Sequence, residues 1–270
     1  MRVAFQGEPG AFSEEAVLRL FPDAEPVARR SFRAVFEAVT ERAVERGLVP
    51  LENSTVGSIN ETYDLLAAGE THIVGEVIVR VDHALLALPG TGLEEIRLVR
   101  SHPQALAQCQ EFLAELGVEA VPVYDTAGAA KQIAEERRAG EAAVAAARAA
   151  GVYGLAVLAE AIQDDRLNQT RFAAIALDPT PIGPPDKTSL VFRAHDIPGA
   201  LYHCLEPFAR LGLNLSKLES RPSGDVPWQY RSYLDVEAGD GDPRLAEALD
   251  VLKEFTAEIH VLGSYPRWME

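Results

Sequence analysis

The sequence predicts an α/β fold over its first two-thirds and a smaller α+β unit behind it. Strand-like and helix-like segments alternate as far as residue 177, which is typical of a sheet with helices on both faces. Four prolines then fall within residues 178–186, and such a stiff, non-helical stretch favours a linker between domains. Behind the linker the pattern becomes strand, helix, strand, strand, helix, strand.

Each element before the linker has a local signal. Glu14 stands near the start of one apolar-periodic segment, where a helix N-terminus favours negative charge. Ser31 is suited to cap a second helix, and Ile59, Tyr63 and Leu66 place apolar side chains on one face of a third. The elements expected are strand 3–5, helix 12–20, helix 32–40, strand 47–51, helix 58–67, two strand-like runs within 73–88, strand 96–99, helix 103–116, strand 118–123, a helix opening at Thr126, a continued pattern over 142–150, and strand 172–177.

The six elements behind the linker form a recognisable order. They are strand 188–194, helix 199–211, strand 213–219, strand 230–236, helix 243–255 and strand 259–265. A βαββαβ order indicates a ferredoxin-like sandwich of one sheet and two helices. Units of this kind often pair with a second copy, so we expect a regulatory module here.

Composition narrows the class of protein. The 270 residues carry a formal net charge of −16, which argues against nucleic acid as a partner. An anionic substrate would have to be held by a few local donors, because the overall field repels it. No stretch approaches the roughly 20 apolar residues of a membrane span. The N-terminal apolar run is too short for a signal peptide, and the two distant cysteines, Cys109 and Cys204, predict a cytoplasmic chain without a disulfide framework.

The sequence predicts neither a metal nor a nucleotide cofactor. Its six histidines show no metal-ligand spacing with cysteines or carboxylates, and no CxxC is present. The glycine-containing turn at residues 7–10 lacks the GxGxxG pattern, and no lysine loop of the Walker type occurs.

Residues 168–172 are the segment that most suggests chemistry. Asn168, Thr170 and Arg171 bring an amide, a hydroxyl and a permanent cation to the point where a polar loop enters an apolar strand. Functional groups concentrate at such junctions because the scaffold fixes their geometry. The group could donate a proton to an oxygen beside a bound carboxylate. The alternative is a Thr-containing strand start with a surface arginine.

Three further strand–helix junctions carry polar side chains. Residues 50–58 combine three hydroxyls with Asn53 and Gly57, which suits a carboxylate cradle or, more simply, helix capping by Ser58 or Asn60. At Asp125-Thr126 capping is the simpler explanation, and His102 in the segment 101–104 is most readily a structural group.

Taken together, these segments resemble the prephenate dehydratase family with a C-terminal ACT domain, over essentially the whole chain. The order and spacing of the motifs carry the resemblance, and Asp125 departs from it because the family commonly has serine there. The N-terminal loop also resembles plant arogenate dehydratases. The motifs are QGEPGAFS (6–13), ENS (52–54) with Gly57-Ser58, SHPQAL (101–106), NQTRF (168–172), DKTSL (186–190), PGAL (198–201) and ESRP (219–222).

The resemblance implies a catalytic domain over residues 1–180, folded as two lobes around a cleft like a type 2 periplasmic binding protein, and an ACT domain over 187–270. It implies the conversion of prephenate to phenylpyruvate, CO2 and water in phenylalanine synthesis, without a cofactor. Phenylalanine bound at the ACT domain would inhibit, and the chain would form a homodimer or homotetramer. The alternatives are an arogenate dehydratase with the same chemistry and a non-catalytic amino-acid sensor.

The resemblance also assigns roles to individual residues. Thr170 would donate a hydrogen bond or proton to the leaving hydroxyl, Glu52 or a water would relay that proton, and Arg171 would clamp a carboxylate. The other expected substrate-binding residues are Asn53, Ser54, Gly57, Ser58, Thr126, Asn168 and Phe172. The expected phenylalanine site consists of Gly199, Ala200, Leu201, Asn214, Leu215, Glu219, Ser220 and Arg221.

Overall fold

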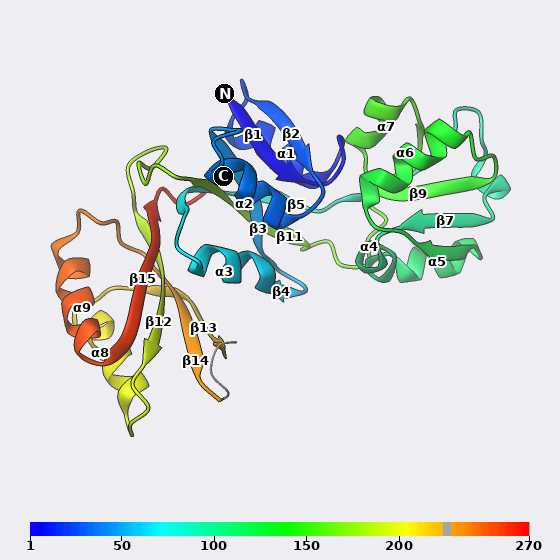
Figure 1. Cartoon of the computed structure of the whole chain (residues 1–270). Helices are drawn as coiled ribbons and strands as arrows, with labels where there is room; N and C mark the ends of the chain where they lie inside the picture. The colour runs from blue at the N-terminus through cyan, green and yellow to red at the C-terminus, as the bar shows by residue number, and fades with distance from the viewer. Residues whose placement is uncertain (224–227, 270) are drawn as a thin grey trace.

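The computed structural model of the protein describes residues 1–223 and 228–269. Three sheets organise the described residues, and each forms the centre of one body of the molecule (Figure 1). We call these bodies lobe 1 (residues 2–80 and 169–176), lobe 2 (83–159) and the C-terminal unit (187–265). Among the described residues, no helix is long and apolar enough to cross a membrane.

Lobe 1 is built around a sheet of order β2-β1-β3-β11-β5. β11 runs antiparallel to both of its neighbours, whereas β1 runs parallel to β2 and β3. The two-residue strand β4 pairs with the end of β3. The elements are β1 (Arg2–Gln6), α1 (Phe12–Leu20), β2 (Glu25–Arg29), α2 (Phe32–Thr40), β3 (Arg46–Asn53), β4 (Gly57–Ser58), α3 (Asn60–Ala67), β5 (His72–Arg80) and β11 (Gln169–Ala176).

Lobe 2 is inserted between β5 and β11, so the chain crosses between the lobes twice. Its sheet has the order β10-β6-β9-β7-β8. Alanines fill much of the space between this sheet and α6, which lets the helix lie close to the strands. The elements are β6 (His83–Ala87), η1 (Leu93–Glu95), β7 (Leu98–Ser101), α4 (Pro103–Gln108), α5 (Gln110–Leu116), β8 (Glu119–Pro122), α6 (Thr126–Glu136), β9 (Glu141–Ala146), α7 (Arg148–Tyr153) and β10 (Ala156–Ala159).

The C-terminal unit is a four-stranded sheet of order β13-β14-β12-β15 with two helices. One face of the sheet forms a core with the helices through residues such as Phe192 and Phe208. Its other face packs on lobe 1, where Tyr233 and Tyr265 join the same hydrophobic cluster as Tyr63. The elements are β12 (Lys187–Ala194), α8 (Ala200–Arg210), β13 (Leu215–Pro222), β14 (Tyr230–Val236), α9 (Pro243–Glu254) and β15 (Thr256–Tyr265).

The predicted fold class is confirmed: a two-lobed α/β part precedes a βαββαβ unit. Three details of the expected elements are wrong. β2, β4 and β10 were not expected, and the pattern over 142–150 divides between β9 and α7. The expected helix 103–116 is two helices that meet at Cys109, because the Asp164 carboxylate accepts from the amides of Gln110 and Glu111 and so begins a new helix there.

Candidate active site

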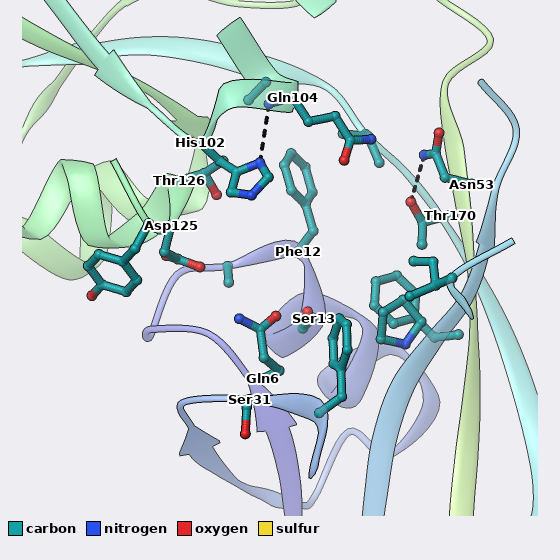
Figure 2. Close-up of a pocket in the computed structure, with 18 of the residues that line it drawn as sticks. Gln6, Phe12, Ser13, Ser31, Asn53, His102, Gln104, Asp125, Thr126 and Thr170 are labelled. Atoms are coloured by element: carbon teal, nitrogen blue, oxygen red, sulfur yellow. Dashed lines mark hydrogen bonds between the residues drawn. The ribbon is translucent and has the colours of Figure 1, made fainter. Parts of the chain in front are cut away.

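A cavity of about 440 Å³ lies between the two lobes and is lined by side chains of both (Figure 2). Asn53 and Thr170 stand on one side of it, and Asp125 and Thr126 stand across from them. The floor of the cavity comes from β1, α1 and the start of α2. The lining from these elements includes Gln6, Phe12, Ser13, Ser31 and Phe32.

The centre of the site is the pair formed by Asn53 on β3 and Thr170 on β11. These residues are register partners of the antiparallel ladder, and the Asn53 Nδ2 donates to the Thr170 Oγ1 at 2.9 Å. The orientation of the Asn53 amide is fixed, because its Oδ1 accepts from the backbone N–H and the hydroxyl of Thr55 at 3.0 and 2.6 Å. Since the Thr170 oxygen accepts from Asn53, its own proton is available to a ligand in the cavity.

Two other expected substrate-binding residues also line the cavity. Phe172 is two residues beyond Thr170 on β11, and alternate strand residues share a face. Thr126 is the first residue of α6, whose N-cap Asp125 accepts from the Gly128 amide at 2.7 Å. Burial raises the pKa of Asp125, and hydrogen bonds from backbone amides of α6 only partly offset it. Asp125 therefore caps α6, and both Asp125 and Thr126 line the cavity.

Arg171 and Glu52 lie on the opposite face of the same sheet, so their expected places in the cleft are wrong. The physical reason is the alternation of strand side chains: Thr170 faces the cavity, and the next residue must face away. The Arg171 Nε and the Glu52 Oε1 are 2.8 Å apart, and neither residue lines the cavity. In this structure neither side chain is placed for the expected clamp by Arg171 or the expected proton relay through Glu52.

Ser58 and Gly57 belong to β4 and also lie outside the cavity. The Ser58 hydroxyl accepts from the Lys217 Nζ at 2.6 Å and donates to the Glu219 carboxylate, both in the C-terminal unit. Gly57 is exposed, with a φ of 86°, and supplies the turn into β4. The expectation that Ser58 caps a helix is wrong, because pairing with β3 leaves Ile59 at the start of α3.

Ser54 and Asn168 support the Asn53–Thr170 pair without lining the cavity. The Asn168 Oδ1 accepts from the Asn53 Nδ2 at 2.7 Å, and Asn168 is buried. The Ser54 hydroxyl accepts from the Gln169 amide at 2.9 Å and donates to the Leu167 carbonyl at 3.0 Å. Both residues tie the end of β3 to the start of β11.

Several lining residues were not singled out from the sequence as site residues. His83 opens β6; its Nε2 is 3.0 Å from the Gln108 Oε1, and its ring contacts that of Phe12 at 5.5 Å between centroids. Burial lowers the pKa of His83, which the hydrogen bond to Gln108 opposes. The signal that could have found Phe12 and Ser13 was present, because both belong to the first quoted motif. The other lining residues missed are Gln6, Ala11, Arg30, Ser31, Phe32, Pro50, Ile59, Glu61, Val81, His102, Gln104, Ala105, Gln108, Tyr124 and Asp125.

The residues expected to bind phenylalanine lie at the start of α8 and along β13, and they do not all face one cavity. Leu201 and Ser220 line a second cavity, of about 480 Å³, together with Trp228 and Tyr230. Glu219 and Arg221 instead face lobe 1, and the Arg221 guanidinium donates to the Asn60 carbonyl at 3.2 Å. Gly199 is the N-cap of α8 with a φ of 82°, ahead of Ala200. Leu215 begins β13, and the Asn214 carbonyl accepts from the Glu237 amide.

Comparison with known families and proteins bears on both parts of the chain. The family model described as prephenate dehydratase matches residues 3–180, and the model described as ACT domain matches residues 188–254. Arogenate dehydratase/prephenate dehydratase 2, chloroplastic, of Arabidopsis thaliana is 46% identical over 98% of this chain and 73% of its own length. Arogenate dehydratase 2 of Petunia hybrida is also 46% identical, over 98% of this chain and 72% of its own.

Solved structures agree with the fold. The prephenate dehydratase of Arthrobacter aurescens, solved in complex with L-Phe, is 33% identical with a TM-score of 0.90, over 99% of this chain and 90% of that one. GqqA, described as a novel type of quorum quenching acylase, is 36% identical with a TM-score of 0.91, over 99% and 98% of the two chains. With a family model over residues 3–180 and relatives of this identity along almost its whole length, the chain belongs to the prephenate dehydratase family and carries a C-terminal ACT domain.

Proposed function

We propose that the chain is a dehydratase that converts prephenate to phenylpyruvate, CO2 and water. The observation that carries the proposal is the Thr170 hydroxyl, which faces the cavity between the lobes while its oxygen accepts from Asn53 at 2.9 Å. The family membership supplies the reaction class. A direct assay tests it: purified enzyme with prephenate should produce phenylpyruvate, read by its absorbance, and the absence of turnover would contradict the proposal.

The reaction needs help at only two points of the substrate. Loss of CO2 breaks the carbon–carbon bond to the ring carboxylate, and that electron pair moves through the ring to expel the hydroxyl on the opposite carbon. Aromatisation supplies the driving force, so the protein must orient the carboxylates and assist the departing hydroxide. Thr170 donates a hydrogen bond to that oxygen as its bond breaks, and a positioned proton donor is typically worth about 10²–10⁴-fold in rate.

Neutral donors and one cation are available to hold the substrate carboxylates. Thr126 and the first turn of α6 present a hydroxyl and a helix N-terminus to the cavity, and Arg30 reaches it from the segment before α2. We infer that these groups replace Arg171 as the carboxylate-binding elements, since Arg171 faces away. Phe172 and Phe12 supply apolar walls for the ring.

Arogenate is the second candidate substrate, and Asp125 is the observation that favours it. Arogenate differs from prephenate in carrying an ammonium group where prephenate has a keto group. The Asp125 side chain is buried at the cavity wall, where its carboxylate could pair with that ammonium. The ratio of kcat/KM on the two substrates decides between them, since a buried carboxylate near the group would favour arogenate.

Amide hydrolysis is a third activity to assay, because GqqA is described as an acylase. The cavity contains Ser13, Ser31 and His102, but no hydrogen bond within residues 1–223 and 228–269 joins a serine of the cavity to His102. The His102 Nδ1 instead accepts from the Gln104 amide at 3.2 Å. Turnover of an acylated amine, together with no turnover of prephenate or arogenate, would identify an acylase. No turnover of any of them, together with a rise in melting temperature on adding phenylalanine, would identify the chain as an amino-acid sensor.

Phenylalanine is the proposed effector, bound at the ACT domain. The Arthrobacter relative was solved with L-Phe, and here a cavity at the ACT domain is lined by Leu201 and Ser220. We propose that two ACT domains pair in a homodimer or homotetramer, supported by the exposed apolar side chains of Leu201, Tyr202 and Leu218 around the edge strand β13. Light scattering should give a mass of two or four chains, and a single chain would contradict the pairing.

The proposal also covers the cellular location and the domain boundaries. We propose a cytoplasmic location because both cysteines, Cys109 and Cys204, are free and buried, whereas several plant relatives are named as chloroplastic. We also propose that residues 1–180 and 187–270 are separate domains, supported by the two family models that match within those ranges.

A further inference from the structure

A group of buried and half-buried charged side chains joins the back of the catalytic strands to the ACT domain. We call it the interdomain charge cluster; its members come from β3, β5, β11, β12, β13 and β14. Arg171 and Glu76 are at its centre, 7% and 3% exposed as side chains. The members are Glu52, Glu76, Arg171, Lys187, Lys217, Glu219 and Asp235.

Arg171 contacts three carboxylates with three different nitrogens. Its Nε lies 2.8 Å from Glu52, its Nη1 3.1 Å from Glu76, and its Nη2 2.9 Å from Asp235 of the ACT domain. Burial disfavours its charge, but Asp235 and the other acids outweigh this and hold the pKa of Arg171 well above its ordinary value. The guanidinium is planar and rigid, so three partners on three strands leave it little freedom.

The ion pair on the back of the sheet and the polar pair in the cavity share the same two strands. Thr170 pairs in register with Asn53, and the next position pairs Arg171 with Glu52. A shift of register follows directly, between Arg171 and Phe172, so the ladder is irregular at this point. The back-face contacts therefore hold the backbone of the two residues that face the cavity.

We propose that Arg171 and Glu52 are positioning residues that keep the Asn53 amide and the Thr170 hydroxyl at hydrogen-bond distance. Asp235 and Lys217 of the ACT domain in turn fix the side chains of Arg171 and Glu52. This inference rests on the proposed dehydratase function. Asp235 reaches Arg171, the neighbour of Thr170, and Lys217 reaches Glu52, the neighbour of Asn53, at 2.8 Å. Thr170 and Asn53 are thus each followed or preceded in the chain by a residue whose side chain pairs with the ACT domain.

Lys217 also connects this arrangement to the expected effector residues. Its ammonium lies 3.1 Å from Glu219, 2.8 Å from Glu52 and 2.6 Å from the Ser58 hydroxyl. Loss of the Glu219 contact would leave Lys217 with Glu52, the Ser58 hydroxyl and the ring of Tyr63, all of them on lobe 1. Because Glu52 pairs with both Lys217 and the buried Arg171, a change at Lys217 is transmitted to Arg171 through Glu52.

The first test is the isosteric change Asp235→Asn, with Asp235→Glu and Asp64→Asn beside it. In Asp235→Asn the Oδ1 can still accept from the Ser189 hydroxyl. The Oδ2 that faces the Arg171 guanidinium is replaced by an amide nitrogen, which can only donate. We expect kcat on the better substrate to fall by on the order of 10- to 100-fold with KM changed far less, since small misplacements of a reacting group cost about that much. Asp235→Glu should restore part of the loss.

Asp64→Asn is the control for the loss of an ion pair across the same boundary. Asp64 pairs with Arg221 at 3.3 Å and is 66% exposed, and within residues 1–223 and 228–269 it forms no hydrogen bond or ion pair with β3 or β11. It should keep the wild-type kcat. Equal losses in Asp64→Asn and Asp235→Asn, or a wild-type kcat in a folded Asp235→Asn, would overturn the proposal.

Hydrogen exchange gives a readout that needs no activity. Peptides covering residues 50–55 and 167–173 should exchange faster in Asp235→Asn than in the wild type, and those of lobe 2 should not. If the wild type turns over neither substrate, the proposed function fails, while unchanged exchange in the variant would overturn the positioning role by itself. Should Asp235→Asn fail to fold, Lys217→Met carries the same test through Glu52 and the 50–55 peptide.

Discussion

The amide of Asn53 donates to the hydroxyl oxygen of Thr170 across two strands that are 117 residues apart in the chain, at 2.9 Å. The direction of this hydrogen bond matters as much as its length. Because an amide nitrogen can only donate, the threonine oxygen is the acceptor, and the threonine proton is left for a ligand. A threonine is a weak acid by itself, so the hydrogen bond from Asn53 must favour its role as donor.

Thr170→Ala should lower kcat by about 10²–10⁴-fold, because it removes the positioned proton donor while leaving the strand intact. Thr170→Ser should keep most of the activity, since the hydroxyl remains. Steady-state kinetics of both variants on prephenate and arogenate provide the measurement. Near-wild-type turnover by a Thr170→Ala protein with an unchanged melting temperature would remove Thr170 from the mechanism.

Phenylalanine should raise the melting temperature of the wild type and inhibit it. A ligand at 100 times its Kd stabilises the state that binds it by about 2.7 kcal/mol. Leu201→Ala should reduce both effects, because Leu201 lines the cavity at the ACT domain. Val152→Ala is the control: Val152 is 45% exposed, close to the 44% of Leu201, but lies on lobe 2. A full phenylalanine effect in Leu201→Ala would place the effector elsewhere.

The ion pairs of Lys217 should make stability depend on acid pH. Burial opposes ionisation of Glu52, yet Arg171 and Lys217 outweigh it, so its pKa lies below the ordinary 4.5. The unfolded chain then binds more protons, and this stabilisation is complete above pH 4.5 and lost as the pH falls through the lower, folded pKa.

Lys217→Met should therefore lower the melting temperature most above pH 4.5, with the difference from wild type shrinking as the pH falls through the lower, folded pKa of Glu52. Lys253→Met is the comparison, because Lys253 pairs with Asp250 on an exposed face, where a single ion pair contributes about 0–1 kcal/mol. A constant difference between Lys217→Met and wild type at all pH values would show that Glu52 is not the group involved.

Gly263→Ala should destabilise the contact between the ACT domain and lobe 1. A Cβ at Gly263 on β15 would stand 2.1 Å from the Ile73 carbonyl oxygen on β5, so the two strands would have to separate. Overpacking of this kind costs about 1–3 kcal/mol. Gly241→Ala, whose Cβ would meet nothing within 4 Å, should melt like the wild type. Calorimetry of the two variants tests this, and equal melting temperatures would contradict the close packing.

Much of the fold was readable from the sequence because its signals are local. The helices α1 and α2 begin and end where the apolar spacing and the Ser31 cap indicated. Departures from the expected helices could not be predicted where a group far away in the sequence causes them. Asp164 divides the expected helix 103–116, and β3 draws Ser58 into a strand, each through contacts over many residues.

The candidate site was readable in part, for a related reason. The motif around Thr170 pointed to the right strand, but strand alternation, applied strictly, would have separated Thr170 and Phe172 from Arg171. Glu52 and Asn53 divide in the same way between the two faces. The charged partner of Arg171 in the ACT domain, Asp235, could not be inferred, since nothing local links positions 64 residues apart.

The place of β11 in lobe 1 has a consequence for synthesis of the chain. β11 lies between β3 and β5 in the sheet, although it is made after all of lobe 2. A ribosome therefore releases a complete lobe 2, contiguous from β6 to β10, before lobe 1 can close. Until residue 176 has emerged, the edges of β3 and β5 stay open, and the nascent chain is most exposed to wrong strand pairing in that interval. The strand that carries Thr170 thus also completes the folding of the lobe around it.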